Sequence, residues 1–156
     1  MKSDLPAHKT EEESEGRLLA VDYGSKRVGL AMSDPLGIIA RSAGVMMNDL
    51  SLLPNIAKLV TENDIGRIVV GMPFAPDGGK GSKAREVDEF IAALGRTVSA
   101  HIEIWDESYT SVNAQRVFRE GGMKKKKRQQ KERVDEMAAR LLLQDYLDCH
   151  QRGSEV

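Results

Sequence analysis

The amino-acid sequence predicts an α/β domain in which α-helices flank a mixed β-sheet. Three short apolar segments come first along the chain, and two more then alternate with segments of helical periodicity. An opening strand meander followed by strands that alternate with helices is the element order of a mixed sheet covered by helices. At 156 residues the chain can bury one sizeable core, so we expect a single domain.

Five segments have the character of β-strands. The first two flank a turn signal, Gly-Ser-Lys, at residues 24–26, which is typical of a β-hairpin. The fourth segment (RIVVG) is a continuous apolar run of the kind found in strands that are covered on both faces. The expected strands are residues 17–23, 28–32, 67–71 and 102–105, with a further short strand within residues 38–46.

Four further segments are expected to be helical, chiefly because their apolar residues recur every three or four positions. The third of these segments stops at a pair of glycines, and the fourth follows a run of basic residues. The expected helices are residues 52–60, 84–98, 110–120 and 134–147.

Both ends of the chain are expected to lie outside the folded domain, residues 17–150. Residues 1–16 predict a disordered acidic leader, and residues 151–156 a short tail. No stretch approaches the roughly 18 apolar residues of a membrane helix, and the leader lacks the apolar segment of a signal peptide. The single cysteine, Cys149, excludes an internal disulfide and a Cys-based zinc site. We therefore expect a cytoplasmic protein with no membrane partner.

Acidic residues stand where hydrophobic elements end or begin. Asp22 ends the first expected strand, Asp106 and Glu107 end the last one, and Asp135 opens the final helix. An ionised carboxylate beside an apolar face is costly unless a cation or hydrogen-bond donors stabilise it. The residues that helical geometry places on the same face as Asp135 are Ala138, Ala139, Leu142 and Leu143.

Each acid taken alone has a plain structural explanation. Asp22 could form a turn, Asp106 or Glu107 could cap the next helix, and Asp135 could interact favourably with a helix dipole. Taken together, strand ends and a helix start in one sheet could bring these carboxylates to one point. Hard oxygen ligands of this kind suit Mg²⁺ or Mn²⁺, the ions of phosphodiester-cleaving sites.

Four segments of the sequence resemble the YqgF/RuvX family over roughly residues 18–148: LLAVDYGSKRVGLAMSDPLG, IVVGMP, WDESYTS and VDEMAARLLLQDYL. The resemblance implies an RNase H-like fold with a five-stranded mixed sheet. It also implies that Asp22, Glu107 and Asp135 are catalytic and bind Mg²⁺ or Mn²⁺. Neighbours along a strand face opposite ways, so only one of Asp106 and Glu107 should face the metal, and the resemblance favours Glu107. One departure is Ser108, where the family usually has Arg.

A cluster of cations immediately precedes Asp135. Lysines and arginines there could neutralise phosphates near the acids and give salt-sensitive binding to nucleic acid. A solvated charge run is the alternative, but the position beside a candidate catalytic acid favours nucleic-acid contact. The turn between the first two strands could extend the same surface. The candidate nucleic-acid-binding residues are Lys26, Arg27, Lys124, Lys125, Lys126, Lys127 and Arg128.

The resemblance implies a divalent-metal-dependent nuclease, a hydrolase that acts on structured RNA or branched DNA. We expect it to process the 5′ end of pre-16S rRNA in ribosome biogenesis, with Holliday junction resolution in recombination and repair as the alternative. A junction-cutting enzyme should be a homodimer that places two cuts symmetrically, and the sequence does not reveal one.

Two other classes of protein were weighed against a nuclease. A nucleic-acid-binding module without catalysis stays open, and it predicts that Asp22→Asn changes no activity. A sugar-kinase or actin-like phosphotransferase is disfavoured, because such enzymes enclose ATP between two duplicated domains that 156 residues cannot supply.

Overall fold

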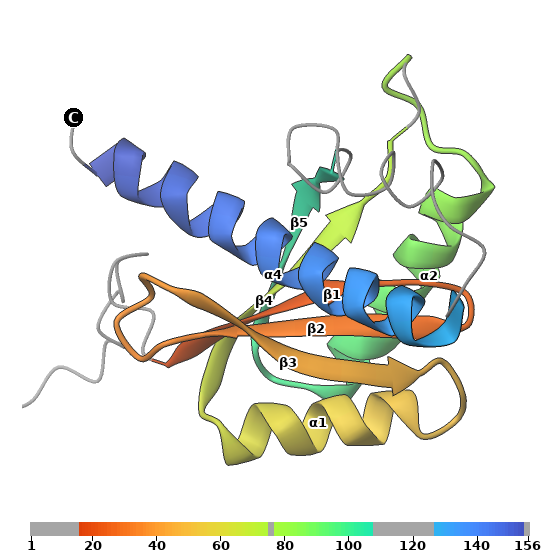
Figure 1. Ribbon diagram of the computed structural model, residues 1–156, viewed down its shortest axis with the longest axis horizontal. Helices are drawn as coiled ribbons and strands as arrows, with labels where there is room; N and C mark the ends of the chain where they lie inside the picture. Colours follow the sequence, from red (N-terminus) through yellow and green to blue (C-terminus); the bar gives the residue numbers. More distant parts are fainter. Residues whose placement is uncertain (1–15, 75–76, 108–126, 155–156) are drawn as a thin grey trace, which may run out of the picture.

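The computed structural model describes residues 16–74, 77–107 and 127–154. Figure 1 shows a twisted sheet with helices packed on both of its faces. The elements along the chain are β1 (Arg17–Asp22), β2 (Arg27–Ser33), β3 (Ala40–Met47), α1 (Leu52–Glu62), β4 (Ile65–Met72), α2 (Ser82–Thr97), β5 (His101–Asp106) and α4 (Lys127–Ser154).

The strands form one five-stranded sheet in the order β3-β2-β1-β4-β5. The strand β2 pairs antiparallel with β1 and β3, whereas β4 pairs parallel with β1 and β5. The predicted α/β class with a five-stranded mixed sheet is therefore confirmed. Because β1 is the central strand, its last residue lies at the end of the sheet, with two strands on either side.

Side chains that alternate along the strands fill two separate cores. One core lies between the sheet and the helices α1 and α2, and it includes Val21, Val70 and Phe90. The other lies under α4 and contains smaller strand residues, such as Ala20, against Leu142 of the helix. Small strand residues allow a helix to approach the sheet closely, so the position of α4 is set by the sheet beneath it.

The last helix begins earlier and ends later than expected. It runs from Lys127 to Ser154, so it includes part of the basic run and most of the predicted tail. Asp135 therefore lies inside the helix rather than opening it, and this prediction was wrong. Lys, Arg, Gln and Glu are good helix formers, and residues 127–134 contain no glycine or proline that would stop the helix.

Several predictions concern residues outside those described. These are most of the acidic leader, the helix expected over residues 110–120, Ser108 and the lysines at 124–126. No helix in the described part of the chain has the length and apolar character needed to cross a membrane.

Candidate active site

Asp22 is the last residue of β1, and its side chain lies on the sheet face that α4 covers. Ala20, two residues earlier, packs in the core under α4, and alternation puts Asp22 on the same side. Among the described residues only three polar or charged side chains are buried, and Asp22 and Glu107 are two of them. Burying a carboxylate costs free energy that charges or hydrogen bonds must offset, so two buried carboxylates on one sheet make this place a candidate functional site.

Asp22 stands between two glycines of the neighbouring strands. Gly29 of β2 is its antiparallel partner, and Gly71 of β4 directly follows Val70, the parallel partner of Val21. These three residues form a row across the sheet, which we call the glycine–aspartate row. Adjacent strands lie about 4.8 Å apart, so the row is about 10 Å long. Since glycine has no Cβ, the sheet surface on both sides of Asp22 is open to groups from other elements.

Glu107 directly follows β5 and occupies the space over Gly71. A Cβ atom on that glycine would lie 2.5 Å from Glu107 Oε1 and 2.5 Å from Leu142 Cδ1 of α4, which is closer than real Cβ atoms come to their neighbours. Glu107 thus lies on the α4 face, like Asp22. Its neighbour Asp106 pairs with Met72, which is buried in the core on the opposite face.

Asp135 lies against Gly29, the other glycine of the row, because α4 packs closely on β2. Its carbonyl group lies over Gly29, and a Cβ atom on the glycine would be 2.9 Å from the carbonyl carbon. The Asp135 carboxylate pairs with Arg27, with 3.4 Å between Nε and Oδ2. The neighbours on the same helical face are all buried, as their spacing predicts: Ala138, Ala139, Leu142 and Leu143.

The structure therefore brings the three predicted acids to one end of one sheet face. Three carboxylates offer the hard oxygen ligands that suit Mg²⁺ or Mn²⁺, so the donor chemistry fits a divalent ion. In the part of the chain that the structure describes, no three acidic, histidine or cysteine side chains stand together closely enough to hold a metal ion. A metal site here requires side-chain rotation. The Asp135 carboxylate is paired with the Arg27 guanidinium group.

The predicted basic surface is only partly described. Lys26 is exposed in the turn that precedes β2, where its ammonium group is open to solvent. Arg27 is directed to Asp135 instead. Lys127 and Arg128 form the first turn of α4, while the lysines at 124–126 lie beyond the described residues.

A polar network holds the C-terminal half of α4 to the sheet. The Tyr146 hydroxyl donates to Glu103 of β5 (2.5 Å) and accepts from Arg67 of β4 (2.9 Å). Arg67 and Glu103 also pair directly at 3.3 Å. Burial, followed by the hydrogen bond with Glu103, raises the pKa of Tyr146 to about 12. The network fixes α4 about three turns after Asp135 and so helps to keep the helix in register over the sheet.

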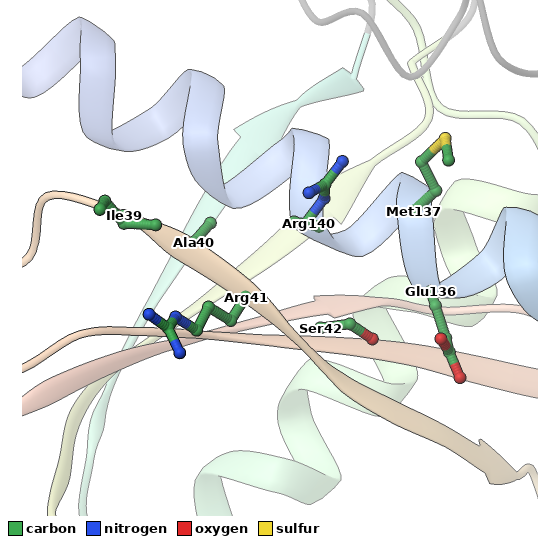
Figure 2. A pocket seen from close by; sticks show the side chains of 7 residues that line it. All are labelled: Ile39, Ala40, Arg41, Ser42, Glu136, Met137 and Arg140. Carbon is green, nitrogen blue, oxygen red and sulfur yellow. The ribbon is translucent and has the colours of Figure 1, made fainter.

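A pocket of about 530 Å³ lies between β3 and α4, away from the buried acids. Its residues include Ser42, Glu136, Arg41 and Arg140. Figure 2 shows the two arginine side chains directed away from each other, Arg41 extending from β3 and Arg140 from α4. Because its charged groups do not converge, we do not assign the active site to this pocket.

Gly29 and Gly71 are the site residues that the sequence interpretation missed. Both lie inside apolar strand segments, in RVGLA and IVVGM. A glycine within a strand weakens it and often marks close approach of another group. That signal was present in the sequence, although it could not tell which element approaches each glycine.

Comparison with known proteins finds similarity over most of the chain. A family model described as "RuvX: Holliday junction resolvase" matches residues 16–149. A protein of Koribacter versatilis named "Putative pre-16S rRNA nuclease" is 41% identical over 135 residues, covering 85% of this chain and 87% of that protein. A protein of the same name from Syntrophomonas wolfei is 36% identical over 144 residues, covering 89% of this chain and 99% of that protein.

Solved structures show the same architecture. One is Thermus thermophilus RuvC in complex with a Holliday junction substrate, with a TM-score of 0.55, 12% identity, and coverage of 87% of this chain and 96% of that one. Another is the fowlpox virus Holliday junction resolvase, with a TM-score of 0.50, 15% identity, and coverage of 85% and 99%. At these identities the likeness concerns the fold, which is the RNase H-like fold that the sequence predicts.

Proposed function

The chain belongs to the RuvX family, and on that basis we propose that it is a divalent-metal-dependent nuclease that hydrolyses phosphodiester bonds in structured nucleic acid. The family model matches residues 16–149, and the two relatives named as nucleases cover 85% and 89% of this chain.

The observation that carries this proposal is the glycine–aspartate row. It places buried Asp22 between Gly29 and Gly71, the two positions over which Asp135 and Glu107 lie. A packed core gains nothing from carboxylates at three such positions, whereas a site for a cation and a phosphodiester needs them. The non-catalytic alternative leaves this concentration of acids unexplained.

We assign metal binding to Asp22, Glu107 and Asp135, with Mg²⁺ or Mn²⁺ as the ion. The bound ion supplies charge neutralisation at the scissile phosphate and activation of the attacking water. Asp22 and Glu107 provide two buried carboxylates on the sheet face under α4. Asp135 completes the set from the helix. Lys26, Lys127, Arg128 and the lysines at 124–126 are proposed to bind substrate phosphates beside these acids.

For the substrate, we propose the 5′ end of pre-16S rRNA, and we place the reaction in the cytoplasm. The names of the two relatives support this choice. The family description supports the alternative, a Holliday junction in recombination or repair. That alternative requires a homodimer, because two symmetric cuts need two sites.

The test is a cleavage assay on the purified full chain. Labelled pre-16S rRNA and a labelled four-way DNA junction are each incubated with Mg²⁺, Mn²⁺ or EDTA, using the wild type and Asp22→Asn. We expect metal-dependent cutting that the variant loses, and the preferred substrate selects between the two roles. Binding of either substrate without cutting under every condition contradicts the proposal and favours a non-catalytic binding module.

A further inference from the structure

Arg27 has a fixed place at the edge of the candidate site. The turn before β2 is held to the end of β3, because Asn48 donates from its side chain to the Gly24 carbonyl (2.7 Å) and from its backbone to the Lys26 carbonyl (2.9 Å). Gly24 also packs against the Arg27 carbonyl, where a Cβ atom would not fit. These contacts fix the backbone from which the Arg27 side chain extends.

The Arg27 side chain lies on the same sheet face as the acids. It is two residues before Gly29 in β2, so alternation puts both on the α4 face. From there it meets the Asp135 carboxylate at 3.4 Å. The side chains are 21% and 15% exposed, so the pair is mostly shielded from water, and the guanidinium group still has a path to solvent.

Arg27 and a divalent ion compete for the same carboxylate. A carboxylate that is largely removed from water is stabilised by a nearby cation, and Arg27 provides one for Asp135 in this structure. A second cation at close range would be repelled by the guanidinium group, because like charges interact strongly where water is partly excluded. Binding a metal ion at Asp135 therefore favours departure of Arg27.

We propose that Arg27 is a positioning residue that couples metal binding to substrate binding. In the metal-free protein it neutralises Asp135. When the ion binds, Arg27 leaves Asp135 and binds a substrate phosphate next to the exposed Lys26. An arginine suits both partners, because its planar group pairs with carboxylate and phosphate alike. This inference rests on the proposed metal-dependent nuclease function.

Such coupling has two measurable consequences. In the absence of nucleic acid Arg27 weakens metal binding, since it must first be displaced. In its presence the phosphate draws Arg27 away and metal binding becomes tighter. Coupling between binding equilibria is reciprocal, so metal must tighten substrate binding by the same factor.

The first experiment compares metal binding by the wild type, Arg27→Gln, Arg27→Lys and the control Arg96→Gln. Arg96 lies in the last turn of α2, on the opposite side of the sheet, and its loss changes the net charge equally. Binding of Mn²⁺ is measured by electron paramagnetic resonance, with and without a non-cleavable RNA. We expect Arg27→Gln to bind Mn²⁺ about two- to fivefold more tightly without RNA, the range for a partly exposed ion pair. Adding RNA should also tighten Mn²⁺ binding less in Arg27→Gln than in the wild type.

Arg27→Lys retains the charge and should bind Mn²⁺ nearly as the wild type does, and Arg96→Gln should match the wild type. Weaker Mn²⁺ binding by Arg27→Gln would mean that Arg27 orients Asp135 for the metal, which overturns the proposal. Unchanged binding overturns it too. Failure of the wild type to bind any metal, with or without RNA, instead contradicts the proposed metal dependence.

A second experiment needs no variant, so it stands even if Arg27 substitutions unfold the protein. The arginine Nε–H signals of the wild type are followed by nuclear magnetic resonance during titration with Mg²⁺. We expect the Arg27 signal to move as the ion binds, whereas that of Arg96 stays in place. An Arg27 signal that is unchanged at saturating Mg²⁺, in a protein that cuts its substrate, refutes the coupling but leaves the nuclease function intact.

Discussion

The carbonyl group of Asp135 in α4 lies directly on Gly29 in β2, with no side chain between the helix and the strand. Gly29 is also the cross-strand partner of Asp22. The distance between these two acids is therefore set by a helix–sheet contact that only glycine allows. The position of one candidate catalytic residue depends on a residue that carries no chemistry of its own.

We expect Gly29→Ala to lower both stability and activity. The added methyl group meets backbone atoms of Asp135, which cannot move without shifting α4. Overpacking of this kind costs about 1–3 kcal/mol in the free energy of unfolding. Urea denaturation measures the loss, and the cleavage assay measures the accompanying fall in rate.

Gly95→Ala is the matched control for that substitution. Gly95 is in α2, and a methyl group there would make an ordinary 3.9 Å contact with Ile102. Replacing glycine by alanine in a helix should stabilise the protein by about 0.5–1 kcal/mol. Equal effects of the two substitutions would contradict the role given to Gly29.

Lys26→Gln tests the proposed contact with substrate phosphates. Loss of one phosphate contact should weaken binding at low salt and reduce the slope of log K against log salt by about 1. Binding is measured in EDTA to prevent cutting. Lys58→Gln is the control, since Lys58 is an exposed lysine of α1, on the opposite sheet face, paired only weakly with Glu62. A slope that falls equally for both variants would show that Lys26 has no specific role.

The Tyr146 network predicts a change in stability at alkaline pH. The unfolded chain loses the tyrosine proton near pH 10, whereas the folded protein keeps it to about pH 12. The unfolded state therefore binds fewer protons in this window, and stability should fall as the pH rises from about 10 to about 12. Ultraviolet absorbance should detect one tyrosine that titrates near pH 12.

Tyr146→Phe should remove that late titration. At neutral pH the loss of its hydrogen bonds should destabilise the protein by about 1–2 kcal/mol. The difference in the free energy of unfolding between variant and wild type should shrink above pH 10, because the stabilisation from the protonated Tyr146 hydroxyl is lost there. A wild type in which every tyrosine titrates near pH 10 would contradict the buried network.

The fold could be predicted largely because hydrophobic periodicity is a local property. The five strand segments and the helices α1 and α2 were expected close to their observed positions. The start of α4 was not, because residues 127–133 are polar and show no apolar periodicity, although their intrinsic helix propensity is high. Helix propensity, and not the hydrophobic pattern, therefore determines where α4 begins.

The site was predictable only in part. Asp22, Glu107 and Asp135 stand out because each acid adjoins an apolar element. Strand alternation sends Asp106 and Glu107 to opposite faces, and the family resemblance favours Glu107. The Arg27–Asp135 ion pair joins residues far apart in the sequence. It depends on how α4 crosses β2, which no local pattern encodes. For the same reason the sequence predicted that Arg27 contacts substrate phosphates and did not predict its ion pair with Asp135.

The most direct test of the site compares Glu107→Gln with Asp106→Asn. The two residues are adjacent, and each substitution removes one carboxylate charge, yet only Glu107 lies against Gly71 under α4. Cleavage of labelled pre-16S rRNA and of a four-way DNA junction is measured with Mg²⁺, and folding is checked by thermal melting. We predict that Glu107→Gln lowers the rate about a hundredfold or more, whereas Asp106→Asn retains most of it. The reverse result, or equal losses in two folded variants, would contradict an active site on the α4 face of the sheet.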